Sequence, residues 1–187
     1  MKYTNLTSHF LIAIPQPADF SFASTLTLVC RHTSDGAQGI IINRPTSLRV
    51  SKMFKQIGIE SPDTRHHSDD RIYAGGPVSV DRGFVLDSGE IRWESSVDVC
   101  HGIQLSTSRD VLLAMANHRG PTHCLVALGY AGWDAGQLER ELANNIWLTC
   151  KADSDIIFCL PPSLRLQAAA SILGVDLNLI PCKAGHA

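Results

Sequence analysis

The sequence has none of the short motifs that mark the common nucleotide-binding and hydrolytic enzymes. It contains no GxxxxGKS/T or GxGxxG phosphate loop, no HExxH zinc-protease motif and no GxSxG nucleophile elbow. Each of these patterns serves a defined chemistry, so these enzyme classes lack sequence support. We therefore predict no cofactor and no catalytic residue from a motif, and whether the protein is an enzyme stays open.

Positive charge is not concentrated anywhere in the chain. The formal net charge is −2, and no run of basic residues occurs. Because sequence-independent binding to nucleic acid depends on such runs, direct nucleic-acid binding is not expected. No apolar stretch approaches the roughly 20 residues that span a bilayer, so we expect no membrane association.

Cysteine is present but never in a redox-motif or zinc-ribbon spacing. No two of the six cysteines are spaced as CxxC. The apolar run Phe10–Ile14 is shorter than the core of a signal peptide, and the only lysine or arginine before it is Lys2. We therefore expect a cytoplasmic protein with reduced thiols. His66-His67 with Asp69 and Asp70 has metal-ligand residue types, but in an exposed loop a solvated cluster is favoured, so no metal is predicted.

The best-specified stretch of the chain is Leu128–Trp147. An apolar run before it, Cys124–Leu128, predicts a buried strand. Asp134 is a good N-cap for the following helix, and Gln137, three residues on, completes a capping box. The expected unit is a strand, a glycine-bearing turn at Gly129–Gly132 and a helix.

Strand and helix signals mix along the rest of the chain without strict alternation. Thr25–Cys30 and Gly39–Asn43 predict a β-hairpin, and Ile72–Val78 and Gly83–Leu86 predict short strands around a turn. Further strands are predicted at Phe10–Ile14, Ile91–Trp93, Gly102–Ser106, Ile156–Leu160 and Leu177–Ile180, and helices at Leu48–Ile57, at Thr107–Arg119 and from Pro161 to Gly174. The pattern favours one α+β domain, residues 1–187, with a mixed and mostly antiparallel sheet.

Two arginines at predicted turns suggest a polar cleft. Arg44 follows Asn43, and Arg82 lies beside Gly83; two guanidinium groups near one cleft would suit an anionic ligand. The alternative is that each arginine pairs with a local carboxylate or carbonyl group. Gly75-Gly76 resembles a phosphate loop but favours a tight turn or bulge. Glu139 either faces a ligand at the cleft or belongs to a packed helix.

Cys30 and His32 lie two residues apart at a strand end. Positions i and i+2 of a strand share a face, so these side chains could form a thiolate–imidazole pair. That interpretation predicts a redox-sensitive cysteine. The alternative is a buried structural cysteine beside a loop histidine, and free cysteine is among the most often buried residue types.

Four segments together resemble the YqgE/AlgH family of bacterial proteins. They are GAQGIIINRP (36–45), YAGGPVSVDRGFVL (73–86), LGYAGWDAGQLERELANNIWL (128–148) and AGHA (184–187). The resemblance implies a branched sheet folded into a pseudo-barrel with flanking helices, and it supplies no catalytic residues. It also implies a regulatory role for one branch of the family. Asp87 departs from the family pattern, since relatives often have histidine there.

The function that these observations favour is a non-enzymatic cytoplasmic protein that binds or regulates an unknown protein or small molecule. Its expected recognition surface consists of the segments Gly75–Arg82 and Leu128–Glu139. The alternatives are a redox sensor that uses Cys30 and His32, or an enzyme with an anionic substrate near Arg44 and Arg82. The alternatives differ in which of these side chains converge on one pocket.

Overall fold

Ten strands and five helices make up the part of the chain that the structure, a computed structural model, describes: residues 5–14, 22–60, 70–100 and 102–177. The strands are β1 (His9–Ala13), β2 (Leu26–Thr33), β3 (Gly36–Ile41), β4 (Pro45–Arg49), β5 (Arg71–Ala74), β6 (Val78–Asp87), β7 (Val97–Cys100), β8 (Ile103–Ser106), β9 (Cys124–Asp134) and β10 (Trp147–Lys151). The helices are α1 (Val50–Gln56), α2 (Arg109–Ala116), α3 (Gln137–Ala143), α4 (Ser154–Phe158) and α5 (Pro162–Ile172). This is the α+β class predicted from the sequence.

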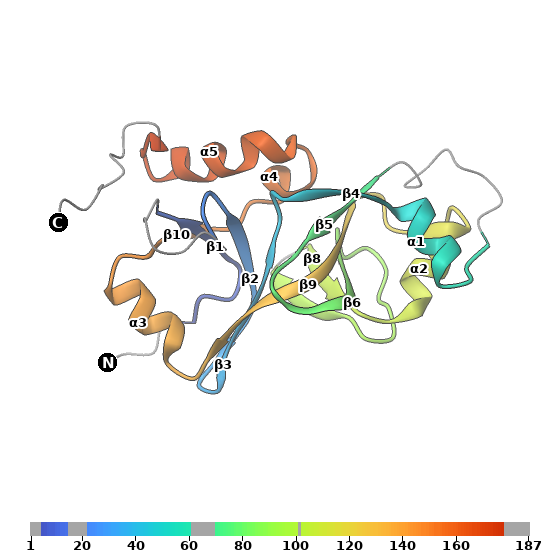
Figure 1. Cartoon of the computed structure of the whole chain (residues 1–187), viewed down its shortest axis with the longest axis horizontal. Helices are drawn as coiled ribbons and strands as arrows, with labels where there is room; N and C mark the ends of the chain where they lie inside the picture. Colours follow the sequence, from blue (N-terminus) through green and yellow to red (C-terminus); the bar gives the residue numbers. More distant parts are fainter. Residues whose placement is uncertain (1–4, 15–21, 61–69, 101, 178–187) are drawn as a thin grey trace.

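β9 is the strand at which the sheet branches. The main strand order is β10-β1-β2-β3-β9-β6-β8-β7, with β4 and β5 off this path. β9 pairs antiparallel with β3 and β6 and parallel with β5. In Figure 1 it runs diagonally through the middle of the molecule and joins the two halves of the sheet. Any surface near β9 can therefore combine residues from distant parts of the chain.

Gly129 allows β9 to contribute to separate hydrophobic clusters. Regular alternation would place Ala127, Ala131 and Trp133 on one face of the strand. Gly129 has φ +72°, a conformation that glycine adopts without strain. Beyond it, Tyr130 packs with Ala127 on the central cluster, whereas Ala131 and Trp133 belong to a different cluster. The side chains of β9 therefore change faces at Gly129.

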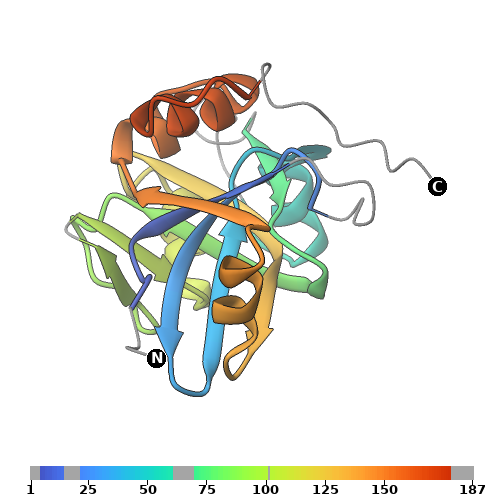
Figure 2. The same cartoon turned by 90° about the vertical axis from the view of Figure 1, so that its left-hand side faces the viewer.

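The central cluster lies inside the curved sheet. Its members include Phe10 from β1, Phe84 from β6 and Ala169 from α5, all buried. Ser8, next to β1, donates a hydrogen bond of 2.9 Å from its hydroxyl to the carbonyl of Val99 in β7. In Figure 2 the strands curve around this interior and α5 lies above it. These contacts bring the two halves of the sheet together, as the expected pseudo-barrel requires.

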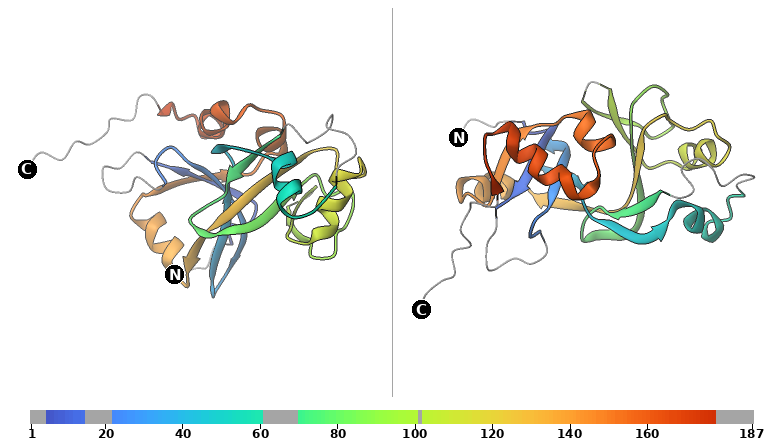
Figure 3. Two further views of the ribbon diagram at one scale, coloured as in Figure 1. Left: turned by 45° about the vertical axis from the view of Figure 1, so that its right-hand side comes forward. Right: turned by 90° about the horizontal axis from the view of Figure 1, so that it is seen from above.

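The helices flank the sheet at three places. α5 packs on β1, β2 and β10, and α3 packs on β3, β9 and β10. α1 and α2 supply Val50, Phe54 and Met115 to a second cluster that also contains Val126 of β9. Figure 3 shows these two helices at the opposite end of the molecule from α5. Within the described part of the chain, no helix residue lines the surface between the β2–β3 hairpin, the end of β9 and the start of β6.

Several predicted elements are confirmed. β2 and β3 form the expected hairpin, paired from Thr27–Ile41 to Thr33–Gly36. Gly58 and Gly174 follow α1 and α5 with φ of +66° and +69°, so glycine ends both helices as predicted. The α1 prediction starts too early, because Pro45–Arg49 forms strand β4.

Two predicted strands are wrong, and three strands, β4, β7 and β10, were not predicted. Ile156–Leu160 overlaps helix α4, which Asp153 caps by accepting a hydrogen bond of 2.8 Å from the backbone N–H of Asp155. Ile91–Trp93 is irregular, and β7 pairs with β8 instead. β10 was not predicted, although it pairs along all of β1. Most of the predicted strand Leu177–Ile180 lies outside the described residues.

Two predicted turns are also wrong. The turn expected between Ile72–Val78 and Gly83–Leu86 lies within the continuous strand β6, and β5 pairs with β4 and β9. Gly129–Gly132 lies within β9 rather than in a turn. Helix α3 starts at Gln137, with Gly136 as its N-cap residue at φ +68°. Of the predicted capping box only the return bond exists, from the backbone N–H of Asp134 to Oε1 of Gln137 at 3.0 Å.

Candidate functional site

A β-bulge separates Cys30 from His32. In the β2–β3 register Val29 pairs with Gly39 and Arg31 with Gln38, so Cys30 is an extra residue without a paired partner. Cys30 packs in the central cluster and its pKa is raised by burial, which disfavours a thiolate. This contradicts the lowered pKa on which the redox hypothesis depends.

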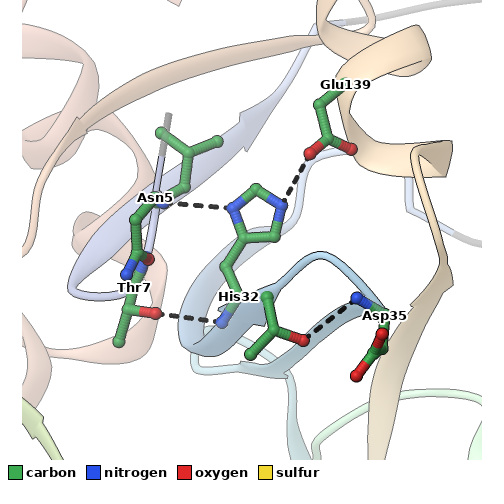
Figure 4. Close-up of polar contacts among 7 residues, drawn as sticks. Asn5, Thr7, His32, Asp35 and Glu139 are labelled. Carbon is green, nitrogen blue, oxygen red and sulfur yellow. Dashed lines mark hydrogen bonds and ion pairs between the residues drawn. The ribbon is translucent and has the colours of Figure 1, made fainter. Parts of the chain in front are cut away.

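His32 instead ties together three segments of the chain. Its Nδ1 accepts a hydrogen bond of 3.1 Å from the backbone N–H of Leu6, and its Nε2 lies 3.1 Å from Oε1 of Glu139 (Figure 4). Its own backbone N–H donates to the hydroxyl of Thr7 at 2.9 Å. Since Nδ1 acts as an acceptor, Nε2 carries the proton and donates it to the carboxylate. Glu139 is therefore engaged by His32 rather than directed at a ligand.

The two arginines have local partners. Arg44 donates from Nη2 to the carbonyl of Ala23 at 2.8 Å. Asn43 accepts from the backbone N–H of Leu26 at 2.8 Å and donates to the carbonyl of Ser24 at 2.9 Å. These bonds hold the segment that leads into β2. The guanidinium of Arg82 lies 5.5 Å from the centre of its neighbour Phe84's ring, a cation–π contact. Pairing with a local carbonyl group thus accounts for Arg44, whereas the printed partner of Arg82 is an aromatic ring.

Gly75 and Gly76 mark a close crossing of two backbones. Gly75 donates to the carbonyl of Leu128 at 2.8 Å and accepts from the N–H of Ile41 at 2.9 Å. A Cβ added at Gly76 would lie 2.0 Å from the carbonyl carbon of Tyr130. The glycines are therefore required by the junction of three strands, and they bring Val78 into register with Tyr130.

The first candidate site is a groove that we call the hairpin groove. It has a volume of about 410 Å³ and lies between the β2–β3 hairpin, the end of β9 and the start of β6. Its lining residues are Arg31, Thr33, Asp35, Gly36, Ala37, Gln38, Val78, Tyr130, Gly132, Trp133 and Asp134. Val78, one of these residues, is 37% exposed, and Val80, two positions further along β6, is 63% exposed. The groove thus unites parts of the two segments predicted to form the recognition surface.

The second candidate site, which sequence reasoning missed, is a cavity of about 270 Å³ that we call the tryptophan cavity. Its walls include the rings of Phe22, Trp133 and Trp147 together with Gln137 and Glu141. No pattern in the sequence predicted a binding role for Trp133 or Trp147. A possible signal was the spacing of the two tryptophans on either side of one short helix that carries a carboxylate.

Asp87 is a buried carboxylate in a third polar cluster. Its Oδ1 accepts from Nε2 of Gln104 and from the N–H of Gly89, both at 2.8 Å, and its Oδ2 accepts from Nε1 of Trp93 at 3.1 Å. Burial raises the pKa of Asp87, and the hydrogen bonds partly offset this effect. Since every one of these partners belongs to the local turn or to β8, the cluster holds the 87–93 segment in place.

Metal and membrane features can be assessed for the described residues only. Within them, no three His, Cys, Asp or Glu side chains gather in a way that could hold a metal ion. His66, His67 and Asp69 of the predicted solvated cluster lie outside the described residues. None of the helices in the described part of the chain has the length and apolarity needed to cross a bilayer.

Known proteins match this chain over nearly its whole length. Residues 10–178 match the family described as AlgH-like. A UPF0301 protein of Thioalkalivibrio sulfidiphilus is 53% identical over 184 residues, which cover 98% of each chain. The solution structure of the AlgH protein from Pseudomonas aeruginosa superposes with a TM-score of 0.81 at 46% identity, over 100% of both chains. A crystal structure of a Corynebacterium diphtheriae protein shares the fold, with a TM-score of 0.69 at 17% identity over 96% of this chain and 93% of the other.

Proposed function

The chain belongs to the AlgH-like family, and we propose that it is a non-catalytic cytoplasmic recognition protein that binds a protein partner at the hairpin groove. The observation that carries this proposal is the pairing of Val78 with Tyr130 beside the groove. This pairing places the segment 78–82 next to the end of β9. Loops and strand ends held by a rigid sheet are where binding residues commonly lie.

The chemistry of the groove suits a segment of polypeptide. Val78 and Tyr130 provide apolar contact area, and Arg31, Asp35 and Asp134 supply charges of both signs to its lining. Protein interfaces commonly combine apolar contact area with polar and charged side chains. A regulatory protein without catalytic activity acts by binding another molecule, and this surface would allow it to bind a protein.

Exposed apolar side chains near the groove are a second observation in favour of a protein-binding site. Val80 is 63% exposed, and the register of β6 against β9 is interrupted between Val78 and Gly83. The intervening residues therefore project an exposed valine next to the groove. Exposed apolar patches that are surrounded by polar residues often mark interaction sites.

Site-specific photo-crosslinking in cells tests this proposal. A benzoylphenylalanine placed at Val80 is expected to give a discrete cross-linked species with one protein partner. The matched control is the same residue at Ile172, which is 52% exposed on α5 at another side of the molecule. Asp134→Lys, which reverses a charge at the groove, is expected to weaken the Val80 product.

Two results would contradict the proposal. The first is a set of cross-linked products that is the same from Val80 and Ile172, or absent from Val80. The second is turnover of a metabolite by the purified protein, since this would make the protein an enzyme.

A further inference from the structure

We propose that the tryptophan cavity binds a small organic cation, a methylated ammonium group, with Glu141 as its counter-charge. This inference does not depend on the function proposed for the hairpin groove, because the ligand and the cavity are different. Gly132 and Trp133 line both sites, on either side of the end of β9.

The aromatic walls of the cavity provide the first part of the argument. The ring centres of Trp133 and Trp147 lie 6.0 Å apart with an interplanar angle of 76°. Phe22 meets Trp147 at 5.6 Å and 77°, and Trp133 at 6.3 Å and 29°. Three rings at such angles present both faces and edges to one space. Cations bind to the faces of aromatic rings, and cages of this kind recognise methylated ammonium groups.

The hydrogen bonding of Glu141 provides the second part. Its Oε2 accepts from the indole Nε1 of Trp133 and of Trp147, both at 2.8 Å, and its Oε1 accepts from Nε2 of Gln137 at 2.9 Å. All three donors are neutral, so they fix the carboxylate without cancelling its charge. No basic side chain of the described residues forms an ion pair with Glu141. Among the described residues, the cavity therefore combines aromatic walls with a fixed carboxylate that forms no ion pair.

The size and polarity of the cavity select among cations. A volume of about 270 Å³ is suited to a small ligand or to the end of one side chain. A primary ammonium group would have to give up several hydrogen bonds to water, while the apolar walls return few of them. A trimethylammonium group has no N–H donors to satisfy and can contact the rings through its methyl groups. We therefore expect methylated ammonium to be preferred over primary ammonium.

Titration with choline and tetramethylammonium tests the inference directly. Isothermal titration calorimetry measures affinity, and the indole N–H resonances in nuclear magnetic resonance spectra locate the ligand. We expect the resonances of Trp133 and Trp147 to shift, while that of Trp93, which bonds Asp87 elsewhere, stays in place. The uncharged isostere of choline, with a tert-butyl group in place of the trimethylammonium group, should bind at least about tenfold more weakly.

Two substitutions examine the charge and the rings separately. Glu141→Gln keeps an acceptor for the indoles and removes the charge, and it should weaken binding by about tenfold or more. Its control is Glu139→Gln on the same helix, which should bind as the wild type does because Glu139 faces His32. If Glu141→Gln does not fold, Phe22→Leu keeps the apolar volume, removes one ring and should still weaken binding several-fold.

The source of the cation is distinguished by comparing choline with a peptide that carries trimethyllysine. Binding of choline alone indicates a free metabolite, binding of the peptide alone indicates a modified protein, and either result supports the inference. The inference is overturned if neither ligand nor tetramethylammonium binds, if the uncharged isostere binds equally well, or if Glu141→Gln leaves the affinity unchanged.

Discussion

Nε2 of His32 and Oε1 of Glu139 lie 3.1 Å apart, although 107 positions separate the two residues in the chain. The imidazole comes from β2 and the carboxylate from α3. The His32 side chain is 1% exposed and that of Glu139 32% exposed, so the bond is shielded on one side only. It fastens α3 to the hairpin that forms one wall of the hairpin groove.

Loss of this carboxylate should destabilise the fold. Glu139→Ala leaves the Nε2–H of His32 buried without an acceptor, and we expect the free energy of unfolding to fall by about 1–2 kcal/mol. Glu139→Gln keeps a carbonyl oxygen as acceptor and should lie close to the wild type. Urea denaturation followed by circular dichroism measures both, and equal losses in the two variants would show that the hydrogen bond is not the cause.

The crossing of backbones at Gly76 predicts a much larger effect. In Gly76→Ala the new methyl group would lie 2.0 Å from the carbonyl carbon of Tyr130, so one of the two strands must move. We expect a loss of more than about 3 kcal/mol or failure to fold. Gly83→Ala in β6 is the control, because its Cβ meets nothing within 4 Å. Soluble yield and melting temperature compare the two, and a stable Gly76→Ala protein would contradict the close approach.

Asp87 should make the free energy of unfolding fall as the pH rises. Burial raises its pKa in the folded protein, so the folded state holds the proton more tightly than the unfolded state does. The stability from this group is complete below the unfolded pKa of about 3.9 and is lost as the pH rises from there through the folded pKa. The wild type should therefore lose stability relative to Asp87→Asn across that window. Urea denaturation at a series of pH values tests this, and a constant difference between the two proteins would refute it.

The cysteines should differ strongly in reactivity. Cys159 is exposed, whereas Cys30 is buried with a raised pKa. Iodoacetamide at neutral pH should modify Cys159 long before Cys30, because Cys30 needs local opening and thiolate formation first. Peptide mass spectrometry over a time course gives both rates. Faster modification of Cys30 would restore the redox hypothesis, and Cys30→Ser is the control for its peptide.

Local signals in the sequence were sufficient for the elements that local chemistry determines. The β2–β3 hairpin follows from β-branched runs around Asp35-Gly36, and α1 and α5 end at glycines in the left-handed conformation. α4 was mistaken for a strand because its apolar run is short and β-branched. The N-cap at Asp153 stabilises the start of this helix, although Ile156 and Ile157 favour a strand.

The site residues were harder to predict because, in β2 and β9, the side chains do not alternate regularly between the two faces of the strand. The bulge at Cys30 sends His32 away from the thiol, and Gly129 sends Trp133 to the face that borders the tryptophan cavity. Neither interruption is visible in a pattern of period two. The partner of Glu139 is His32 of β2, which lies 107 positions away in the chain, so no spacing in the sequence indicates it.

The pairing of β1 between β2 and β10 has a consequence for synthesis on the ribosome. Phe10, Leu11 and Ile12 are fully buried in the finished protein. While the chain is being made, one edge of this apolar strand has no partner until Lys151 has emerged. An unpaired apolar edge is a template for pairing with other chains. β1 is thus synthesised long before β10 but is enclosed on both edges only after β10 has emerged.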